Sequence, residues 1–120
     1  MNNDRFKYRV WHKEEKRYVT GNFSISPFGH LHKIYGDEDG VYEIELDTQV
    51  FAVEQCTGLK DKNGTLIYEG DVVLFVGKVN LAVQYTPNEW EMAGDDVNVP
   101  LTENTARFVK IVGNIHEVTE

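Results

Sequence analysis

Turn-forming residues interrupt this sequence roughly every ten residues, so that only short segments of regular structure fit between them. Several segments alternate apolar and polar side chains, among them residues 5–11 and 41–46. A period of two is typical of a strand with one buried face, and no convincing segment shows the repeat of about 3.6 residues of an amphipathic helix. We therefore predict an all-β fold with little helix, either a small barrel or a sandwich.

The C-terminal half has the clearest strand pattern. Residues 72–76 (VVLFV) form the most apolar run of the chain and predict a central strand. A Gly77-Lys78 turn and a strand over residues 79–85 follow, an order similar to the opening of an SH3-like barrel. This likeness concerns the fold and carries no function. We expect one domain over residues 1–120, in which an N-terminal β segment, 1–55, packs on a small β-barrel, 56–118.

The other elements follow from the same rules. A strand is predicted over residues 17–23 and ends at Gly21-Asn22, and a second alternating segment follows over 23–26. Strands are also predicted over residues 30–35, 107–112 and 115–118, loops over 36–40 and 94–100, and a resumed strand at Trp90 and Met92. Residues 50–54 fit either a strand or one helical turn, because periodicity does not separate the two at this length.

The stretch TGLKDKNGTLIYEGDVV, residues 57–73, contains two turn signals in close succession. The residues DKNG suit a tight hairpin turn, and EGD suits a second turn. A phosphate-binding loop requires a Lys after its last Gly, and Thr65 holds that place, so we interpret the stretch as scaffold. Structural turn roles are predicted for Gly58, Asp61, Asn63, Gly64, Gly70, Asp71 and Gly113.

The chain is acidic, with a formal net charge of −8 at pH 7 and an isoelectric point near 4.9. Nucleic-acid binding depends first on Lys and Arg side chains that neutralise phosphates, so this balance disfavours a nucleic-acid partner. It favours a basic protein partner instead. One basic set near the N-terminus alternates with aromatics, and we interpret it as the solvated face of a hairpin. Its members are Arg5, Lys7, Arg9, Lys13, Lys16 and Arg17.

Cys56 is the one cysteine of the chain, which suits a reducing cytosol, and we expect it to be a small buried hydrophobe. The N-terminal residues lack the apolar run of a signal peptide. No stretch approaches the roughly 18 apolar residues of a membrane-spanning helix. We therefore expect a cytoplasmic protein without a membrane partner.

Two pairs of side chains are of types that bind ions. His30 and His32 place two imidazoles on one strand face, and Asp37 and Asp39 are similar to half of a calcium loop. Neither pair is accompanied by further ligands at the spacing that a metal site requires. We therefore assign no metal, cofactor or catalytic residue. Whether either pair binds an ion stays open at this point.

The residues RVW (9–11), CTGLKDKNG (56–64), IYEGD (67–71) and GNIHE (113–117) together resemble the motifs of the YopX-like family of bacteriophage and prophage proteins. Cys56 and His116 depart from that pattern, in which aromatics are expected, and both look like packing variations. The resemblance implies a phage-encoded protein of the bacterial host cytoplasm with an accessory role. It implies no enzymatic activity, so no catalytic residue is carried over.

The leading functional hypothesis is a non-enzymatic module that binds a host or phage protein, or a second copy of itself through an exposed edge strand. Trp90 and Met92, in the stretch over residues 89–101, are the candidate contact residues. A second hypothesis is a small barrel that binds single-stranded nucleic acid through the N-terminal basic set. A third is an enzyme, although its His, Cys and carboxylate residues select no reaction.

Overall fold

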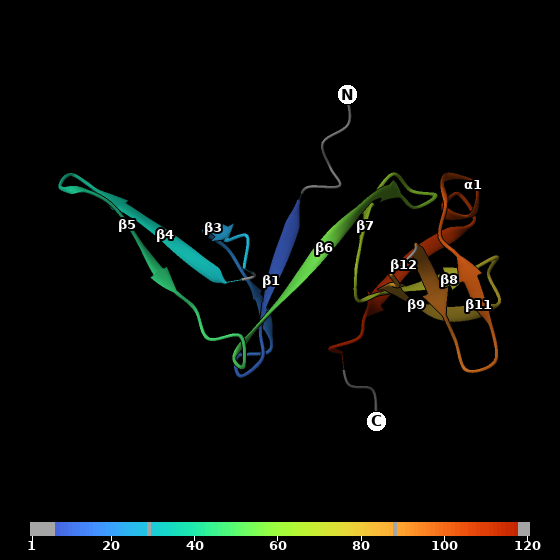
Figure 1. The fold of residues 1–120 in the computed structure, drawn as a ribbon. Coiled ribbons are helices and arrows are strands. Elements are labelled where there is room, and N and C mark those ends of the chain that lie inside the picture. The colour runs from blue at the N-terminus through green and yellow to red at the C-terminus, as the bar shows by residue number, and fades with distance from the viewer. Residues whose placement is uncertain (1–6, 29, 88, 118–120) are drawn as a thin grey trace. The chain divides into compact units, whose positions relative to one another are not determined.

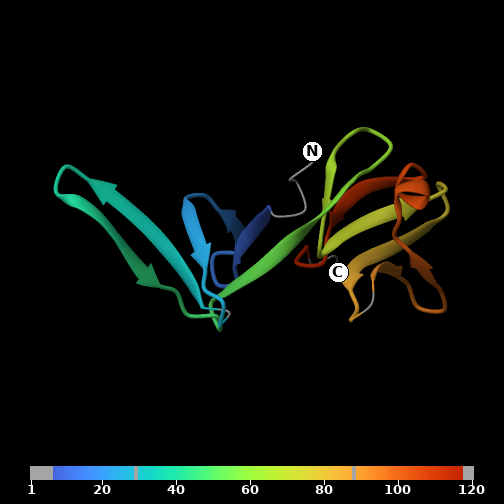
Figure 2. The same ribbon diagram turned by 45° about the horizontal axis from the view of Figure 1, so that its top comes forward.

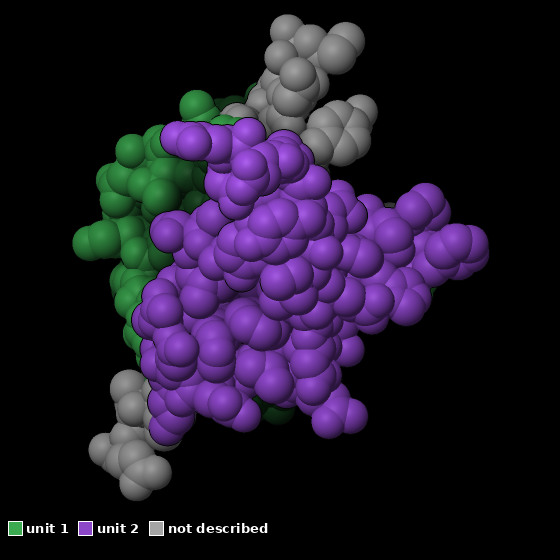
Figure 3. Space-filling model, turned by 90° about the vertical axis from the view of Figure 1, so that its left-hand side faces the viewer, with its two compact units in different colours: residues 1–8, 54–120 green, residues 9–53 purple. Residues whose placement is uncertain are grey.

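The computed structural model describes residues 7–28, 30–87 and 89–117, and within them it contains twelve strands and one short helix (Figure 1). The prediction of an all-β fold with little helix is therefore confirmed. The chain divides into two compact units, coloured separately in Figure 3. Unit 1 comprises Met1–Tyr8 and Glu54–Glu120, and unit 2 comprises Arg9–Val53. The predicted packing of residues 1–55 on residues 56–118 stays a prediction.

Unit 2 is built from short antiparallel strands. Strand β1 begins at the end of the first segment of unit 1 and pairs with β2, while β3, β4 and β5 form a three-stranded sheet in that order. Strand β6 begins in unit 2 and continues into unit 1. The bounds are β1 Tyr8–His12, β2 Arg17–Val19, β3 Asn22–Ile25, β4 Leu31–Asp37, β5 Gly40–Glu45 and β6 Phe51–Lys60.

Unit 1 contains a five-stranded antiparallel sheet in the order β11-β10-β9-β8-β12, which curls into a half-barrel (Figure 2). Strand β7 pairs with β6 beside it. The bounds are β7 Leu66–Tyr68, β8 Asp71–Phe75, β9 Val79–Tyr85, β10 Trp90–Ala93, β11 Asn98–Pro100, α1 Glu103–Ala106 and β12 Val109–Asn114.

The apolar core of unit 1 lies on the inner face of this sheet. The predicted strand VVLFV corresponds to β8, which lies between β9 and β12, and this interior position explains its apolar composition. The buried members of the core are Ile67, Val73, Leu81, Val83, Met92, Leu101, Ala106 and Val109. Apolar burial of this kind provides the main driving force for folding the unit.

Three sequence predictions need correction in the C-terminal half. Gly113 does not end a strand, because it lies inside β12 at a bulge that follows Ile111. The predicted tail strand is wrong for its described residues, where Ile115 and His116 form a turn and the Ile115 N–H donates to the Gly70 carbonyl at 2.8 Å. Val118 lies outside the described residues. The loop predicted over residues 94–100 ends in β11, which pairs with β10.

Unit 2 agrees with one prediction and differs from another. The strand predicted to end at Gly21-Asn22 and the alternating segment predicted after it correspond to β2 and β3, with Gly21 between them at a φ of +149°. The predicted loop over residues 36–40 is a tight hairpin instead, in which the Asp39 N–H donates to the Asp37 carboxylate at 2.8 Å. Because this hydrogen bond stabilises a two-residue turn, β4 and β5 extend into the segment that was predicted to be a loop.

None of the helices in the described residues is long and apolar enough to cross a membrane. Helix α1 was not predicted from the sequence. It spans Glu103–Ala106 and begins at Thr102, whose side chain accepts from the Thr105 N–H in a capping box. Such a short helix has too few residues to show a hydrophobic period.

Substitution of Met92 by Ala is expected to destabilise the protein by about 2–5 kcal/mol, because it leaves a cavity in the core of unit 1. Urea unfolding followed by tryptophan fluorescence measures this loss. The Val112→Ala variant is the control, since Val112 is an exposed residue of β12. An equal effect of both substitutions would contradict the assignment of Met92 to the core.

Candidate functional site

The Asp61 carboxylate organises the hairpin loop of the TGLKDKNG block. It is buried, and one oxygen accepts from the backbone N–H groups of Asn63 and Thr65, both at 2.9 Å. Its other oxygen accepts from the N–H of Ile111 in β12 at 3.1 Å. Gly64 lies in the same turn at a φ of +82°, a conformation that favours glycine. The carboxylate is thus engaged by the backbone of its own chain.

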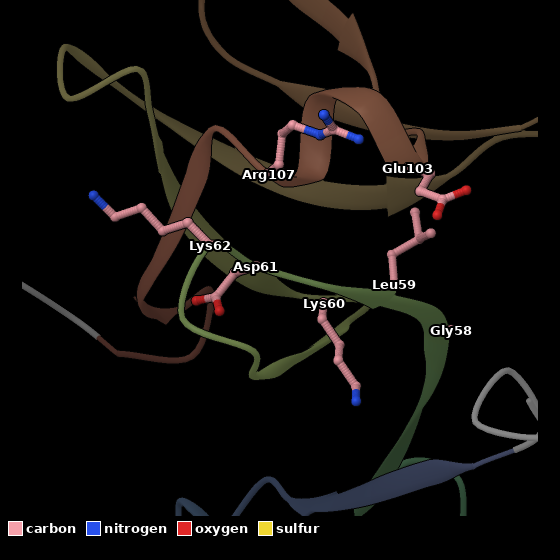
Figure 4. A pocket seen from close by; sticks show the side chains of 7 residues that line it. All are labelled: Gly58, Leu59, Lys60, Asp61, Lys62, Glu103 and Arg107. Carbon is pink, nitrogen blue, oxygen red and sulfur yellow. The ribbon is translucent and has the colours of Figure 1, made fainter.

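A hollow of about 630 Å³ lies beside this loop (Figure 4). Residues 58–62 line one side of it, and Glu103 and Arg107 line the other. Three cationic side chains reach its rim, but Lys60, Lys62 and Arg107 end in different directions (Figure 4). A phosphate cradle requires donors that converge on one point. The arrangement therefore gives no support to anion binding here.

Glu54 and His116 form a side-chain pair in unit 1, with 2.5 Å between Glu54 Oε2 and His116 Nε2. Glu54 is buried and His116 is mostly buried. The pair holds the turn after β12 against β6, and the His116 N–H donates to the Asn114 side chain at 2.9 Å. His116 was predicted to be a packing variation. Its partner Glu54 lies 62 residues earlier in the chain, so the sequence pattern did not reveal the pair.

Gly70 makes room for this pair. A Cβ atom at position 70 would lie 2.7 Å from Glu54 Oε2, and the residue has a φ of +87°. The adjoining Asp71 is buried and accepts from the Tyr68 N–H at 2.7 Å, which closes the turn between β7 and β8. The EGD motif is thus a turn whose glycine also accommodates a buried carboxylate.

The remaining predicted residues of unit 1 lie in or against the core. Cys56 is buried, as predicted. Gly58 has a φ of +81° and lies where the pairing of β6 with β7 shifts register. The prediction that Met92 contacts a partner is corrected, because its side chain is 0% exposed. Trp90 is half-buried and packs against the core and edge-on to Tyr85, at 4.9 Å between ring centroids.

The N-terminal basic set makes internal contacts in unit 2. The Arg9 guanidinium lies 4.4 Å from the centre of the Tyr18 ring, and the Arg17 side chain forms an ion pair with Glu15. Lys13 donates to the Thr48 carbonyl at 3.3 Å. These contacts engage part of the charge that a groove for nucleic acid would need. Arg5 lies outside the described residues.

Strand β5 exposes three large apolar side chains of unit 2. Val41 is 75% exposed, Tyr42 53% and Ile44 47%, and all three belong to β5. Tyr42 stacks on Tyr35 of β4 with 5.4 Å between ring centroids. The sequence predicted this strand from the alternation of its side chains, a pattern that ordinarily indicates one buried face. Here both faces of the strand are open to solvent.

The two histidines predicted on one strand face each lie beside a glutamate of β5. His30 Nδ1 is 3.1 Å from Glu45 Oε2, and His32 Nδ1 is 3.7 Å from Glu43 Oε2. In the described parts of the chain, no three side chains of His, Cys, Asp or Glu are placed to hold one metal ion.

Substitution of Asp61 by Ala is expected to cost about 2–4 kcal/mol, because three backbone N–H groups lose a charged acceptor. Asp37→Ala is the matched control, since that exposed carboxylate accepts one N–H in a surface turn, and its loss is expected to stay below about 1 kcal/mol. Chemical unfolding of both variants measures the difference. Equal losses would refute the organising role of Asp61.

Substitution of Gly70 by Ala is expected to destabilise the protein by about 1–3 kcal/mol, from backbone strain and from the clash with Glu54. Gly64→Ala separates the two causes, because it has a similar φ and no atom within 4 Å of the new Cβ. A larger loss for Gly70→Ala in thermal or urea unfolding isolates the clash. A loss no greater than that of Gly64→Ala would contradict it.

The comparisons with known proteins agree with this fold. The YopX protein family model matches residues 7–120. The crystal structure of protein EF1440 from Enterococcus faecalis is similar, with 25% sequence identity, a TM-score of 0.59 and 92% of each chain covered.

The structure of protein yopX from Bacillus subtilis is also similar. It has 16% identity and a TM-score of 0.64, over 97% of this chain and 94% of that one, and at this identity the likeness concerns the fold. No curated protein matches the sequence. Because the family model extends over nearly the whole chain and includes all four motifs, the chain belongs to the YopX family.

Proposed function

We propose that this protein is a non-enzymatic binding module, encoded by a phage or prophage, that holds a host or phage protein in the bacterial cytoplasm. The single observation that carries the proposal is the exposed apolar face of β5 that is formed by Tyr42 and Ile44, while exposed Val41 lies on the opposite face. We call Tyr42 and Ile44 the β5 patch. Exposed apolar groups that cluster on one element mark interaction surfaces more often than scattered ones do.

The composition of the β5 patch supports protein binding. Tyrosine combines a large apolar ring with a polar hydroxyl and is enriched at interfaces. Tyr42 is already ordered by its stack on Tyr35, so a partner that covers it needs to immobilise little. Lys33 Nζ lies 5.2 Å from the centre of the Tyr35 ring and adds a polar rim.

A non-enzymatic role agrees with how the buried carboxylates of unit 1 are used. Asp61 and Asp71 accept backbone N–H groups, and Glu54 is paired with His116. Each has a structural role that accounts for its burial. The phage origin rests on the resemblance of the sequence motifs.

The test compares capture of a partner by the wild type and by variants. The double variant Tyr42→Ser/Ile44→Ser is expected to lose at least about tenfold in partner affinity, as loss of central aromatic and aliphatic anchors does. Phe108→Ser is the matched control, because Phe108 of unit 1 is also 53% exposed. Capture is made from a bacterial lysate with and without nuclease, and the affinity for the protein identified is then measured with purified components.

Each outcome is decisive. A partner that survives nuclease, and whose affinity drops for the double variant alone, supports the module. Unchanged affinity of the double variant refutes the placement of the contact on β5. Recovery of only nuclease-sensitive material favours single-stranded nucleic-acid binding through the basic set of unit 2, against the charge argument.

A further inference from the structure

We propose that the open edge of β5 receives an extended, basic segment of the partner protein as an additional β-strand. This inference rests on the proposed function and specifies its chemistry. It concerns the backbone edge of β5 and its charges, whereas the β5 patch concerns apolar side chains. Different experiments therefore test this inference and the proposed function.

The backbone of β5 has one edge without a neighbouring strand. In the described residues β5 pairs only with β4, and it forms one end of the sheet β3-β4-β5 (Figure 1). Just after β5, the Leu46 N–H donates to the Leu31 carbonyl of β4 at 2.8 Å. Inward and outward residues alternate in an antiparallel pair. The backbone N–H of Leu46 points toward β4, so the backbone groups of every second residue from Leu46 do so as well. The N–H and C=O groups of the residues between them, Val41, Glu43 and Glu45, therefore point away from β4.

These outward groups are the requirement for strand addition. A peptide that pairs with an open edge gains main-chain hydrogen bonds, and its alternate side chains contact the two faces of the edge strand. On one face of β5 lie Tyr42 and Ile44, and on the other lie Val41, Glu43 and Glu45. An added strand would therefore place every second side chain beside an apolar group and the others beside a carboxylate.

The charge around this edge selects a basic occupant. Residues 36–47 contain six carboxylates and neither Lys nor Arg. The imidazole of His30, just before β4, lies beside Glu45, and that of His32 in β4 lies beside Glu43, while Lys33 lies over the ring of Tyr35 on the opposite face. The carboxylates are Asp37, Glu38, Asp39, Glu43, Glu45 and Asp47. Lysine or arginine at alternate positions of the added strand would lie directly beside Glu43 and Glu45.

The same charges disfavour a second copy of this chain at the edge. If two β5 strands paired in antiparallel fashion about their centres, Glu43 would lie directly opposite the same residue of the second copy. Like charges at directly opposite positions destabilise a sheet. Charged edge strands are a common device against self-association. The charges of the edge therefore favour a basic partner strand and disfavour pairing of β5 with β5 of a second copy.

The first test uses peptides and the wild-type protein. The probe is a fluorescein-labelled seven-residue peptide of alternating Lys and Val, and binding is followed by fluorescence anisotropy. A peptide of the same sequence with alternate backbone nitrogens methylated keeps the charge and side chains but loses half of its N–H donors. We expect at least about tenfold weaker binding of the methylated peptide. An alternating Glu and Val peptide is expected not to bind.

The second test alters the edge itself. Val41→Pro removes one outward N–H and leaves the bonds to β4 in place, because proline is tolerated on the open side of an edge strand. It is expected to weaken peptide binding at least about tenfold, whereas Val41→Ala, which keeps the N–H, changes binding by less than about twofold. The double variant Glu43→Lys/Glu45→Lys is expected to reverse the preference between the Lys and Glu peptides.

Several results would overturn the proposal. Absence of binding to the Lys peptide, equal binding of its methylated form, or equal effects of Val41→Pro and Val41→Ala would each exclude strand addition. A dimer in sedimentation experiments that Val41→Pro abolishes would make a second copy the occupant instead. Circular dichroism verifies folding of each variant, and if Val41→Pro unfolds the hairpin, the methylated peptide decides the question with the wild type.

The outcome for the proposed function stays separate. If Tyr42→Ser/Ile44→Ser loses the captured partner while Val41→Pro and the Lys double variant retain it, the module stands and strand addition fails. If none of these variants affects the captured partner, the contact on β5 fails as well.

Discussion

The Asp61 carboxylate is the interaction on which the architecture of unit 1 depends. It closes the loop between β6 and β7 and also accepts the N–H of Ile111, fifty residues further along the chain. Next to it, the Lys62 N–H donates to the Val109 carbonyl at 3.0 Å. A short, locally determined turn is in this way attached to the last strand of the curled sheet. Buried acceptors of this kind favour one arrangement because alternatives leave donors unsatisfied.

Local chemistry explains what could be predicted from the sequence. The turns over DKNG and EGD and the strand VVLFV depend on neighbouring residues and on burial, and these signals are present in short windows. The tail strand and the role of Gly113 depended instead on distant partners. Gly113 pairs with Val72 of β8 next to the bulge, and the Ile115 N–H donates to the carbonyl of Gly70. No window of a few residues contains that information.

The candidate contact residues show a second reason for failure. Trp90 and Met92 were predicted as partner contacts in the stretch over residues 89–101, yet β10 pairs Met92 with Val83 and directs its side chain into the core. The opposite error concerns β5, whose alternation suggested a buried face and whose side chains are exposed. Alternation indicates that a strand has two unlike faces. It does not indicate whether the apolar face is buried by the same chain, covered by another molecule or exposed to solvent.

The acidic edge of β5 also bears on how this protein stays in solution. An extended apolar strand with unsatisfied backbone groups is a template for sheet growth, and Glu43 and Glu45 are the charges nearest to that template. The two charges therefore oppose growth of the sheet through this edge, independently of any partner. Neutral side chains at both positions are expected to favour aggregation through β5.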